Sequence, residues 1–385
     1  MRLRLPLAWL QIRREPLRLL AAIAGVGFGV VLIFVQLGFR EALFDSAVRF
    51  HTSLGYDIAI VSPKTDTIVR PQPFPRTRLF QALGVDGVES VTPIYMRSAT
   101  WRNPELASDT STIFVMGVDP EDRVFEWPGV AENIKSLRMT DHILFDRASR
   151  PEFGRVEELI EERGRVFTEI NDRAIEVVGL YKLGTSFGID GTVLTSDLNF
   201  FRLFPNRKAS HVDVGLVYLD RGADSQFVRK MIAATVPEDV DVLVRDEFIG
   251  REIAYWSTAT PIGYVFGFGV VMGFVVGMVI VYQILFSDVQ DSLREYATLK
   301  AMGYPHRYLV GVVMRQAILL GIFAYIPAFG FSLILYEQAG AATNLPIVMT
   351  SDRAALVFAL TLFMCCTSAA LAIRKLRSAQ PAEIF

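Results

Sequence analysis

The chain has 385 residues, of which 51% are apolar, and its formal net charge is −2 at pH 7. A near-neutral chain without a long basic run lacks the clustered lysine and arginine that nucleic-acid binding requires, which excludes that class. The two cysteines, Cys365 and Cys366, are adjacent, and neighbouring positions on a helix are poorly placed for a disulfide. The distribution of the apolar residues must therefore identify the class of protein.

Four long uncharged runs contain much of the apolar content: residues 19–39, 253–287, 316–336 and 354–373. A bilayer core of ~30 Å needs about 20 helical residues, and helices satisfy their own backbone groups in lipid. Residues 41–251 contain no uncharged run longer than nine residues. The sequence predicts an integral membrane α-helical protein with four transmembrane helices. A large α/β extracytoplasmic (periplasmic) domain is expected between the first and second helices.

Basic residues predict the orientation of these elements. Arginine and lysine gather before the first run, between the second and third, and after the fourth, and such loops stay cytoplasmic. Both termini are therefore expected in the cytoplasm. The expected order is a cytoplasmic amphipathic helix (1–18), TM1 (19–39), a periplasmic α/β domain with a stalk (40–258), TM2 (259–287), a cytoplasmic coupling helix (288–308), TM3 (309–336), a short periplasmic loop (337–353), TM4 (354–373) and a cytoplasmic tail (374–385).

The region expected outside the membrane has mixed patterns. Runs that are β-branched or alternate in polarity, bounded by turn residues, predict strands at residues 56–62, 111–119, 174–181, 191–196 and 211–220. Residues 77–95 predict a short helix, a turn and another strand, and residues 152–164 predict a helix that covers a sheet. Strand–helix units on both sides of residues 130–150 favour two lobes.

Small residues recur at four-residue spacing in the first two spans: Ala21, Gly25 and Gly29, then Gly269, Gly273 and Gly277. Residues four apart lie on one face of a helix, and small side chains let helix backbones approach closely in lipid. Two readings stay open, packing within one subunit and an interface of a homodimer, and we favour the dimer.

Few residues point to chemistry on this chain. Residues 184–188, GTSFG, fit G-x-S-x-G with Ser186 as a nucleophile, but a nucleophile elbow needs a helix after the serine, and a strand pattern follows. The four histidines lack metal-ligand spacing, so no metal site is expected. The dipeptide Gly-Lys of a P-loop does not occur. If ATP is used, we expect ATP and magnesium on another polypeptide, with no cofactor on this one.

The polar stretch between the second and third spans, residues 287–308, predicts a short capped helix. Ser287 with Gln290 resembles a capping box, and Asp288 favours the positive end of the helix dipole. Gly303 suits the position after the helix, and Pro305 prevents its continuation. These features predict a compact elbow that is held for contact with a partner.

Residues 294–303, REYATLKAMG, resemble the R-E-x-(G/A)-x-x-(K/R)-A-x-G segment between the second and third spans of FtsX-like and MacB-type (type VII) ABC permeases. The order of one span, a large outer domain and three further spans is similar too. The segments at residues 7–39, 142–154 and 374–385 resemble the DevC-type permease.

The resemblance implies a non-catalytic subunit in the inner (cytoplasmic) membrane of a bacterium. It implies an ABC ATPase on a separate chain, a second copy of this chain, surrounding membrane lipids, a periplasmic adaptor (membrane fusion) protein and an outer-membrane channel as partners. The coupling residues carried over from the family motif are Arg294, Glu295, Tyr296, Ala297, Leu299, Lys300 and Gly303. We expect Tyr296 and Leu299 to fill an apolar groove on the ATPase.

We therefore expect a mechanotransmission exporter, in which ATP hydrolysis moves the periplasmic domain and exports an amphipathic substrate, preferably a glycolipid or another envelope lipid. One alternative is a lipoprotein-release permease with a periplasmic chaperone. The second is an FtsX-like signal transducer that activates a cell-wall hydrolase, for which an outer domain of about 210 residues is large. A periplasmic hydrolase that uses Ser186 is a third.

Overall fold

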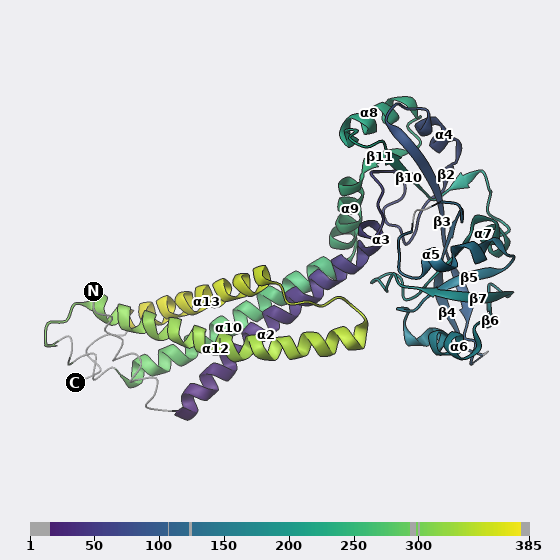
Figure 1. Cartoon of the computed structure of the whole chain (residues 1–385). Coiled ribbons are helices and arrows are strands. Elements are labelled where there is room, and N and C mark those ends of the chain that lie inside the picture. The colour runs from purple at the N-terminus through teal and green to yellow at the C-terminus, as the bar shows by residue number, and fades with distance from the viewer. Residues whose placement is uncertain (1–15, 107, 123–124, 293–297, 299–300, 379–385) are drawn as a thin grey trace. The chain divides into compact units, whose positions relative to one another are not determined.

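The computed structural model describes residues 16–106, 108–122, 125–292, 298 and 301–378 (Figure 1). The chain divides into two compact units. We call Met1–Ala42, Ile262–Thr343 and Ile347–Phe385 the membrane unit, and Leu43–Pro261 with Asn344–Pro346 the outer domain.

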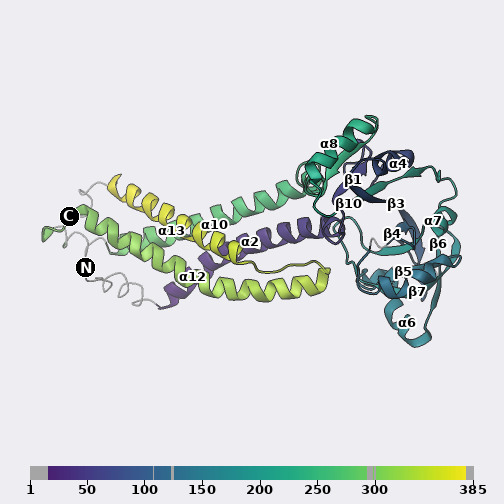
Figure 2. The ribbon, with the colours of Figure 1, turned by 45° about the horizontal axis from the view of Figure 1, so that its top comes forward.

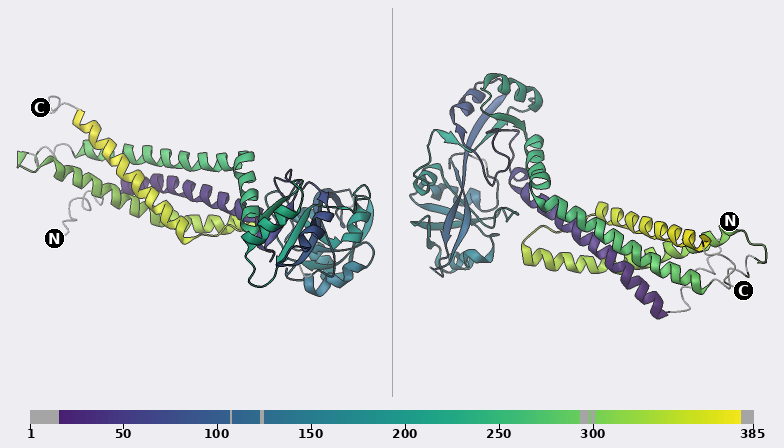
Figure 3. Two further views of the ribbon diagram at one scale, coloured as in Figure 1. Left: turned by 90° about the horizontal axis from the view of Figure 1, so that it is seen from above. Right: turned by 180° about the vertical axis from the view of Figure 1, so that it is seen from behind.

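Four helices of the membrane unit are long and apolar enough to cross a bilayer, which confirms the predicted number of spans. They are α2 (Pro16–Ala47), α10 (Pro261–Asp291), α12 (His306–Thr343) and α13 (Ser351–Ser378). Figures 2 and 3 show these helices running alongside one another. Their shared core takes side chains from every helix, among them Val26, Leu285, Leu320 and Met364.

The predicted helix start at Ser287 is wrong. α10 continues without interruption across Ser287 to Asp291. The reason is packing, because Val281, Leu285 and Val289 continue one buried apolar stripe into the core of the membrane unit. At four-residue spacing these side chains need an unbroken helix to stay on one face.

The outer domain is built on a nine-stranded sheet with the order β11-β1-β10-β3-β4-β8-β5-β7-β6. Its strands are β1 (Ile58–Val61), β3 (Val88–Arg102), β4 (Thr110–Val118), β5 (His142–Asp146), β6 (Val166–Ile170), β7 (Arg173–Tyr181), β8 (Thr192–Ser196), β10 (Val214–Leu219) and β11 (Asp241–Val244). β2 (Phe74–Pro75) and β9 (His211–Val212) form a separate pair. All the predicted strand segments contain strands, and the helices predicted near residues 77 and 156 are α4 (Thr77–Leu83) and α6 (Val156–Arg163).

The strand β3 divides the outer domain into two halves. Residues 88–94 of β3 pair with β10, whereas residues 95–102 pair with β4. β6 pairs with β7 and returns to β3 through Trp101 and Ile170, so β3, β4, β8, β5, β7 and β6 close into a small barrel. We call this part the barrel half. The change of strand partners therefore lies between Ile94 and Tyr95, not at residues 130–150.

Both faces of the sheet are buried. In β1, Ile58 and Ile60 face one hydrophobic core, while Ala59 and Val61 face the other. Alternate side chains of a strand point to opposite faces, so a strand covered on both sides is apolar throughout. α4 and α8 (Ser225–Thr235) cover one core, and α3 (Arg49–Thr52) and α9 (Arg245–Ala254) cover the other.

Candidate coupling site

The predicted coupling segment is described only in part. Arg294, Glu295, Tyr296, Ala297, Leu299 and Lys300 lie outside the described residues. Gly303 is described, and its φ of +88° is the left-handed conformation expected of a glycine after a helix end. α12 begins at His306, directly after Pro305. The coupling role of these residues stays a prediction.

Just before this segment, α10 is tied to the start of α2 by an ion-pair cluster. Arg18 Nη2 lies 3.0 Å from Asp288 Oδ1, and Arg18 Nη1 donates to Asp291 Oδ2 at 2.6 Å. Asp288, which we assigned to the positive end of a helix dipole, and Asp291 therefore both face an arginine 270 or more positions earlier in the chain. All three side chains are partly exposed, so each pair contributes little stability. The cluster fixes which side of α10 faces α2 at this end.

Further along α2 from Arg18, α2 and α10 pack against each other through their glycines. A Cβ atom on Gly29 would lie 3.0 Å from Gly277 Cα and 3.2 Å from Gly273 O. A Cβ on Gly25 would lie 2.8 Å from Ile280 Cγ2. The close approach is thus made between backbones of the same chain.

The other predicted positions of this face differ. Ala21 is exposed, and a Cβ on Gly269 would meet the amide of Gln36. Gln36 belongs to α2, so five of the six predicted residues pack α2 against α10, namely Gly25, Gly29, Gly269, Gly273 and Gly277. A homodimer interface on this face stays a prediction.

At the opposite end of α2 from Arg18, a buried arginine joins three helices. Arg353 of α13 donates Nε–H to Glu41 Oε2 of α2 at 3.0 Å and Nη1–H to the Val348 carbonyl at 2.8 Å. Its guanidinium lies 5.5 Å from the ring centre of Tyr336 in α12, whose hydroxyl donates to the Phe34 carbonyl. A buried charge is tolerated only when it is paired and hydrogen-bonded, so this cluster fixes α2, α12 and α13 to one another.

In the outer domain, the two chain segments that lead to the membrane helices meet at Glu252. We call residues 43–57, which include α3, the first connecting segment, and residues 245–261, which include α9 and η3 (Tyr255–Ala259), the second connecting segment. Glu252 is 1% exposed and accepts from Thr67 Oγ1 at 2.6 Å, from Ile68 N at 3.0 Å and from Trp256 Nε1 at 2.8 Å.

His51 brings the first connecting segment to the same carboxylate. Its Nε2 lies 3.7 Å from Glu252 Oε2, and its ring meets Phe248 edge-on at 4.4 Å. The hydroxyl of Tyr56 lies 3.5 Å from His51 Nδ1. η3 is a π-helix, an irregularity that often occurs at functional sites. The arrangement locks α3 against α9 inside the outer domain.

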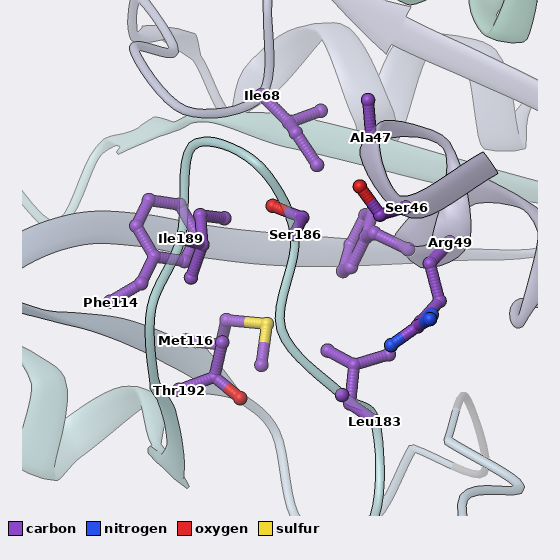
Figure 4. Close-up of a pocket in the computed structure, with 12 residues that line it drawn as sticks. Ser46, Ala47, Arg49, Ile68, Phe114, Met116, Leu183, Ser186, Ile189 and Thr192 are labelled. Atoms are coloured by element: carbon purple, nitrogen blue, oxygen red, sulfur yellow. The ribbon is translucent and has the colours of Figure 1, made fainter. Parts of the chain in front are cut away.

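A small cavity lies beside this junction, between α3, β4 and the loop after β7 (Figure 4). Its volume is about 20 Å³, which holds about one water molecule. Ser46, Arg49, Met116 and Ser186 are among its lining residues. Ser186 forms a bridge with Ile189, and β8 follows instead of a helix. The nucleophile-elbow geometry required of a G-x-S-x-G hydrolase is therefore not present at Ser186.

Among the described residues, no group of three or more His, Cys, Asp or Glu side chains lies close enough together to hold a metal ion.

Comparison with known families fits this architecture. Residues 19–235 match the family model of the MacB-like periplasmic core domain, and residues 264–381 match that of the FtsX-like permease C-terminal region. Two solved structures are similar. One is the periplasmic region of MacB from Actinobacillus actinomycetemcomitans (10% identity, 51% of this chain and 92% of that chain, TM-score 0.36). The other is the extracellular domain of the noncanonic ABC-type transporter YknZ from Gram-positive bacteria (13% identity, 49% and 98%, TM-score 0.33). No curated protein matches the chain.

Four membrane helices, with an α/β periplasmic domain inserted between the first and the second, define the class as a multi-pass membrane protein of MacB-like topology. Since the periplasmic-core match alone covers more than half of the chain, the chain belongs to the MacB/FtsX family of ABC transporter permeases. Permeases of this type work with ATPase partners.

Several residues of the junction were not predicted from the sequence. Glu252 and Trp256 are four positions apart in a helical pattern, which places them on one face. This spacing could have predicted their contact from the sequence. Arg49 and His51 gave no signal, because their partners lie far away in sequence.

Proposed function

We propose that this permease converts ATP hydrolysis by an ABC ATPase on a separate chain into movement of its outer domain. The movement exports an amphipathic substrate, preferably a glycolipid or another envelope lipid, through a periplasmic adaptor and an outer-membrane channel. The chain works as a homodimer in the bacterial inner membrane, with both termini in the cytoplasm. ATP and magnesium bind to the partner ATPase.

The observation that carries this proposal is the buried junction at Glu252. Both connecting segments continue into strands of the outer sheet, α3 toward β1 and α9 from β11, and β1 pairs with β11. A displacement of either connecting segment therefore acts directly on the sheet. Arg245 joins the two segments, since its N donates to the Asp57 carbonyl at 3.0 Å and its Nη2 to the Thr52 carbonyl at 2.8 Å. The Glu252 hydrogen bonds tie the second segment to the loop after β1. A domain held in this way moves as a body when α2 or α10 moves.

The partner ATPase is inferred from the sequence and the family. The Gly-Lys dipeptide of a P-loop is absent from the sequence. Tyr296 and Leu299 would fill an apolar groove on the ATPase, while Arg294, Glu295 and Lys300 would set the register by charge pairing. The Arg18 cluster with Asp288 and Asp291 would hold the end of α10 that receives the force.

The test replaces both proposed anchors, Tyr296→Ala with Leu299→Ala. We expect ATP hydrolysis to continue while export stops, because loss of the anchors removes the contact through which force reaches α10. The measurement compares ATPase activity in purified complexes with the lipid composition of the outer membrane in strains that carry wild type, the double variant or no permease. Met302→Ala is the matched control, since Met302 is a neighbouring apolar side chain that is 62% exposed. An outer membrane of wild-type composition in the double variant would contradict the proposal.

A second experiment separates the alternatives. The complex is purified from native membranes, and its bound proteins and lipids are identified by mass spectrometry. An ATPase with an adaptor and a co-purified envelope lipid supports export. A lipoprotein chaperone in place of the adaptor supports lipoprotein release, and a cell-wall hydrolase supports signalling.

A further inference from the structure

The loop between β7 and β8 contains the GTSFG motif that the proposed function leaves unexplained. We call residues 184–189 the latch loop. Ser186 N donates to Ile189 O at 2.9 Å and Ile189 N to Ser186 O at 3.3 Å, so the loop is a tight turn. Gly184 has a φ of +99°, a conformation that other residues rarely adopt. Because β7 and β8 belong to the barrel half, a contact with this loop is a contact with the barrel.

The first connecting segment touches the latch loop through Arg49. The Arg49 Nη1 donates to the Thr185 carbonyl at 3.2 Å. A Cβ atom on Gly184 would lie only 2.0 Å from the same nitrogen. The guanidinium therefore lies directly on the glycine backbone, and a side chain at this position would displace it.

Beneath Arg49, the barrel supplies a carboxylate. Asp146, at the end of β5, accepts from Gly184 N at 2.8 Å and from Leu183 N at 3.2 Å. Burial raises the pKa of Asp146, which these hydrogen bonds oppose. Burial likewise lowers the pKa of Arg49, and the Asp146 charge opposes that shift. The Asp146 charge therefore offsets part of the desolvation of Arg49.

The second connecting segment touches the same loop from another side. The rings of Phe187 and Trp256 meet edge-on with centroids 5.4 Å apart. A Cβ on Gly188 would lie 3.1 Å from the Trp256 ring. Trp256 is itself fixed by its hydrogen bond to Glu252, so the latch loop is held by the same junction that joins the connecting segments.

We infer that the latch loop fastens the barrel half to both connecting segments, with Arg49 as the positioning residue that makes the barrel follow them. The inference rests on the proposed function for the direction of movement. Residues 94 and 95 of β3, where the strand changes partners, are the place at which the barrel half would bend relative to the rest of the sheet. The latch loop is positioned by its own turn and the Asp146 hydrogen bonds on the barrel side, and by the Arg49 and Trp256 contacts on the side of the connecting segments.

The test follows spin labels in the full chain with its ATPase in lipid nanodiscs, after Cys365→Ala and Cys366→Ala. Labels are placed at three exposed positions: Gly250→Cys in α9, Glu161→Cys in the barrel half and Val348→Cys in the membrane unit. Double electron–electron resonance then measures the distances between pairs of labels, with and without ATP.

In the wild-type background, ATP should shift both the α9 label and the barrel label relative to the label in the membrane unit. In Arg49→Met, we expect the α9 shift to be kept and the barrel shift to fall to about half or less. The ATP-free distance distribution between the α9 and barrel labels should also broaden. A barrel shift equal to that of wild type would overturn the inference and leave the proposed function intact.

If ATP moves neither label in the wild-type background, the proposed function fails. The latch is then judged by the ATP-free distribution alone, and an unbroadened distribution in Arg49→Met overturns it. The two failures are therefore distinguishable.

Further variants separate a lost latch from a misfolded domain. Gly184→Ala should cause the same defect, and the double variant with Arg49→Met should be no worse than either single one, since both break one contact. Phe187→Ala removes a 43% exposed ring and should give a smaller defect without unfolding. Arg147→Gln is the matched control: it removes a nearby arginine that pairs with Glu157 at 3.1 Å.

Discussion

The segments that contain α2 and α10 contact each other twice, once in the membrane unit and once in the outer domain, where the connecting segments meet. The two contacts differ in the groups that form them. In the membrane unit, Gly29 packs against Gly273 and Gly277, backbone to backbone. In the outer domain, the buried carboxylate of Glu252 in the second connecting segment accepts three hydrogen bonds, from that segment and from the loop after β1. His51 of the first connecting segment lies beside it, at 3.7 Å. The glycine contact depends on how closely the two helix backbones fit. The Glu252 contact depends on the geometry of its hydrogen bonds.

This difference indicates how each contact is held together. Small residues at a helix interface let helix backbones approach closely, without long side chains that interlock. Hydrogen bonds to a buried charged group hold only in one geometry, and breaking them leaves buried groups without partners. The proposed function would use both properties: a close-packed contact without hydrogen bonds between the membrane helices, and a hydrogen-bonded contact where the outer domain is attached.

The largest effect is expected from Gly29→Leu, which breaks the shape-based contact. The added side chain would face Gly277 Cα at 3.0 Å and Gly273 O at 3.2 Å, and these backbone atoms cannot rotate away. We expect α10 to be displaced from α2, with a loss of roughly 3 kcal/mol of stability, the upper end for overpacking, and with loss of export. Thermal unfolding of the detergent-solubilised chain and the outer-membrane lipid assay measure the two effects.

Gly267→Leu is the matched control for this variant. Gly267 lies on α10, the helix that Gly29 packs against, and a Cβ there would meet nothing within 4 Å. If Gly29→Leu were as stable as wild type, the glycine contact would not be close-packed. The proposed difference between the glycine contact and the Glu252 contact would then be wrong.

A smaller effect is expected from Glu252→Ala, which breaks the directional contact. The hydroxyl of Thr67, the amide of Ile68 and the indole N–H of Trp256 would lose their acceptor in a buried site. Unsatisfied buried groups cost about 1–3 kcal/mol each, but water relieves much of this cost, so a total near 2 kcal/mol and a fall in Tm of about 6 °C are expected. Glu238→Ala removes an exposed carboxylate and is the control. Equal Tm values for the two variants would contradict a structural role for Glu252.

Much of the fold could be predicted, because its signals are local. Four uncharged runs are enough to predict four membrane helices, and the β-branched runs identified β1, β4, β7, β8 and β10 correctly. The partner exchange within β3 was not predictable in this way. Its position depends on which strands lie beside Ile94 and Tyr95, and strand pairing is set by tertiary packing.

The site was less predictable, because its contacts join distant positions. The glycine spacing predicted a close-packed helix face, and Gly29 lies against Gly277 of the same chain; a second copy at this face stays a prediction. The capping-box prediction at Ser287 was wrong because Val289 continues the buried stripe of α10, and burial outweighs a local cap. Arg49 and Gly184 are 135 positions apart, so no local pattern connects them.

The smallest effect is expected from Asp122→Asn, which tests a carboxylate that lacks the three donors of Glu252. Burial raises the pKa of Asp122 to about 6, with the Asp119 charge as the next cause, while a hydrogen bond with Thr92 opposes the shift. Because the folded-state pKa is raised, the protonated form stabilises the fold. That contribution is complete below the ordinary pKa of 3.8 and is lost as the pH rises through about 6.

Asparagine cannot ionise, so Asp122→Asn should match wild type near pH 4 and become more stable than wild type above pH 6. Solvent screening limits the gain to about 1 kcal/mol, or roughly 3 °C in Tm. Thermal unfolding of the full chain from pH 4 to 8 measures it, with Asp220→Asn, at an exposed position, as the control. A constant difference between Asp122→Asn and wild type across this range would show that Asp122 is as well solvated as a surface carboxylate. In that case, the lack of donors like those of Glu252 would not destabilise the charged form of Asp122, and the comparison between the two carboxylates would fail.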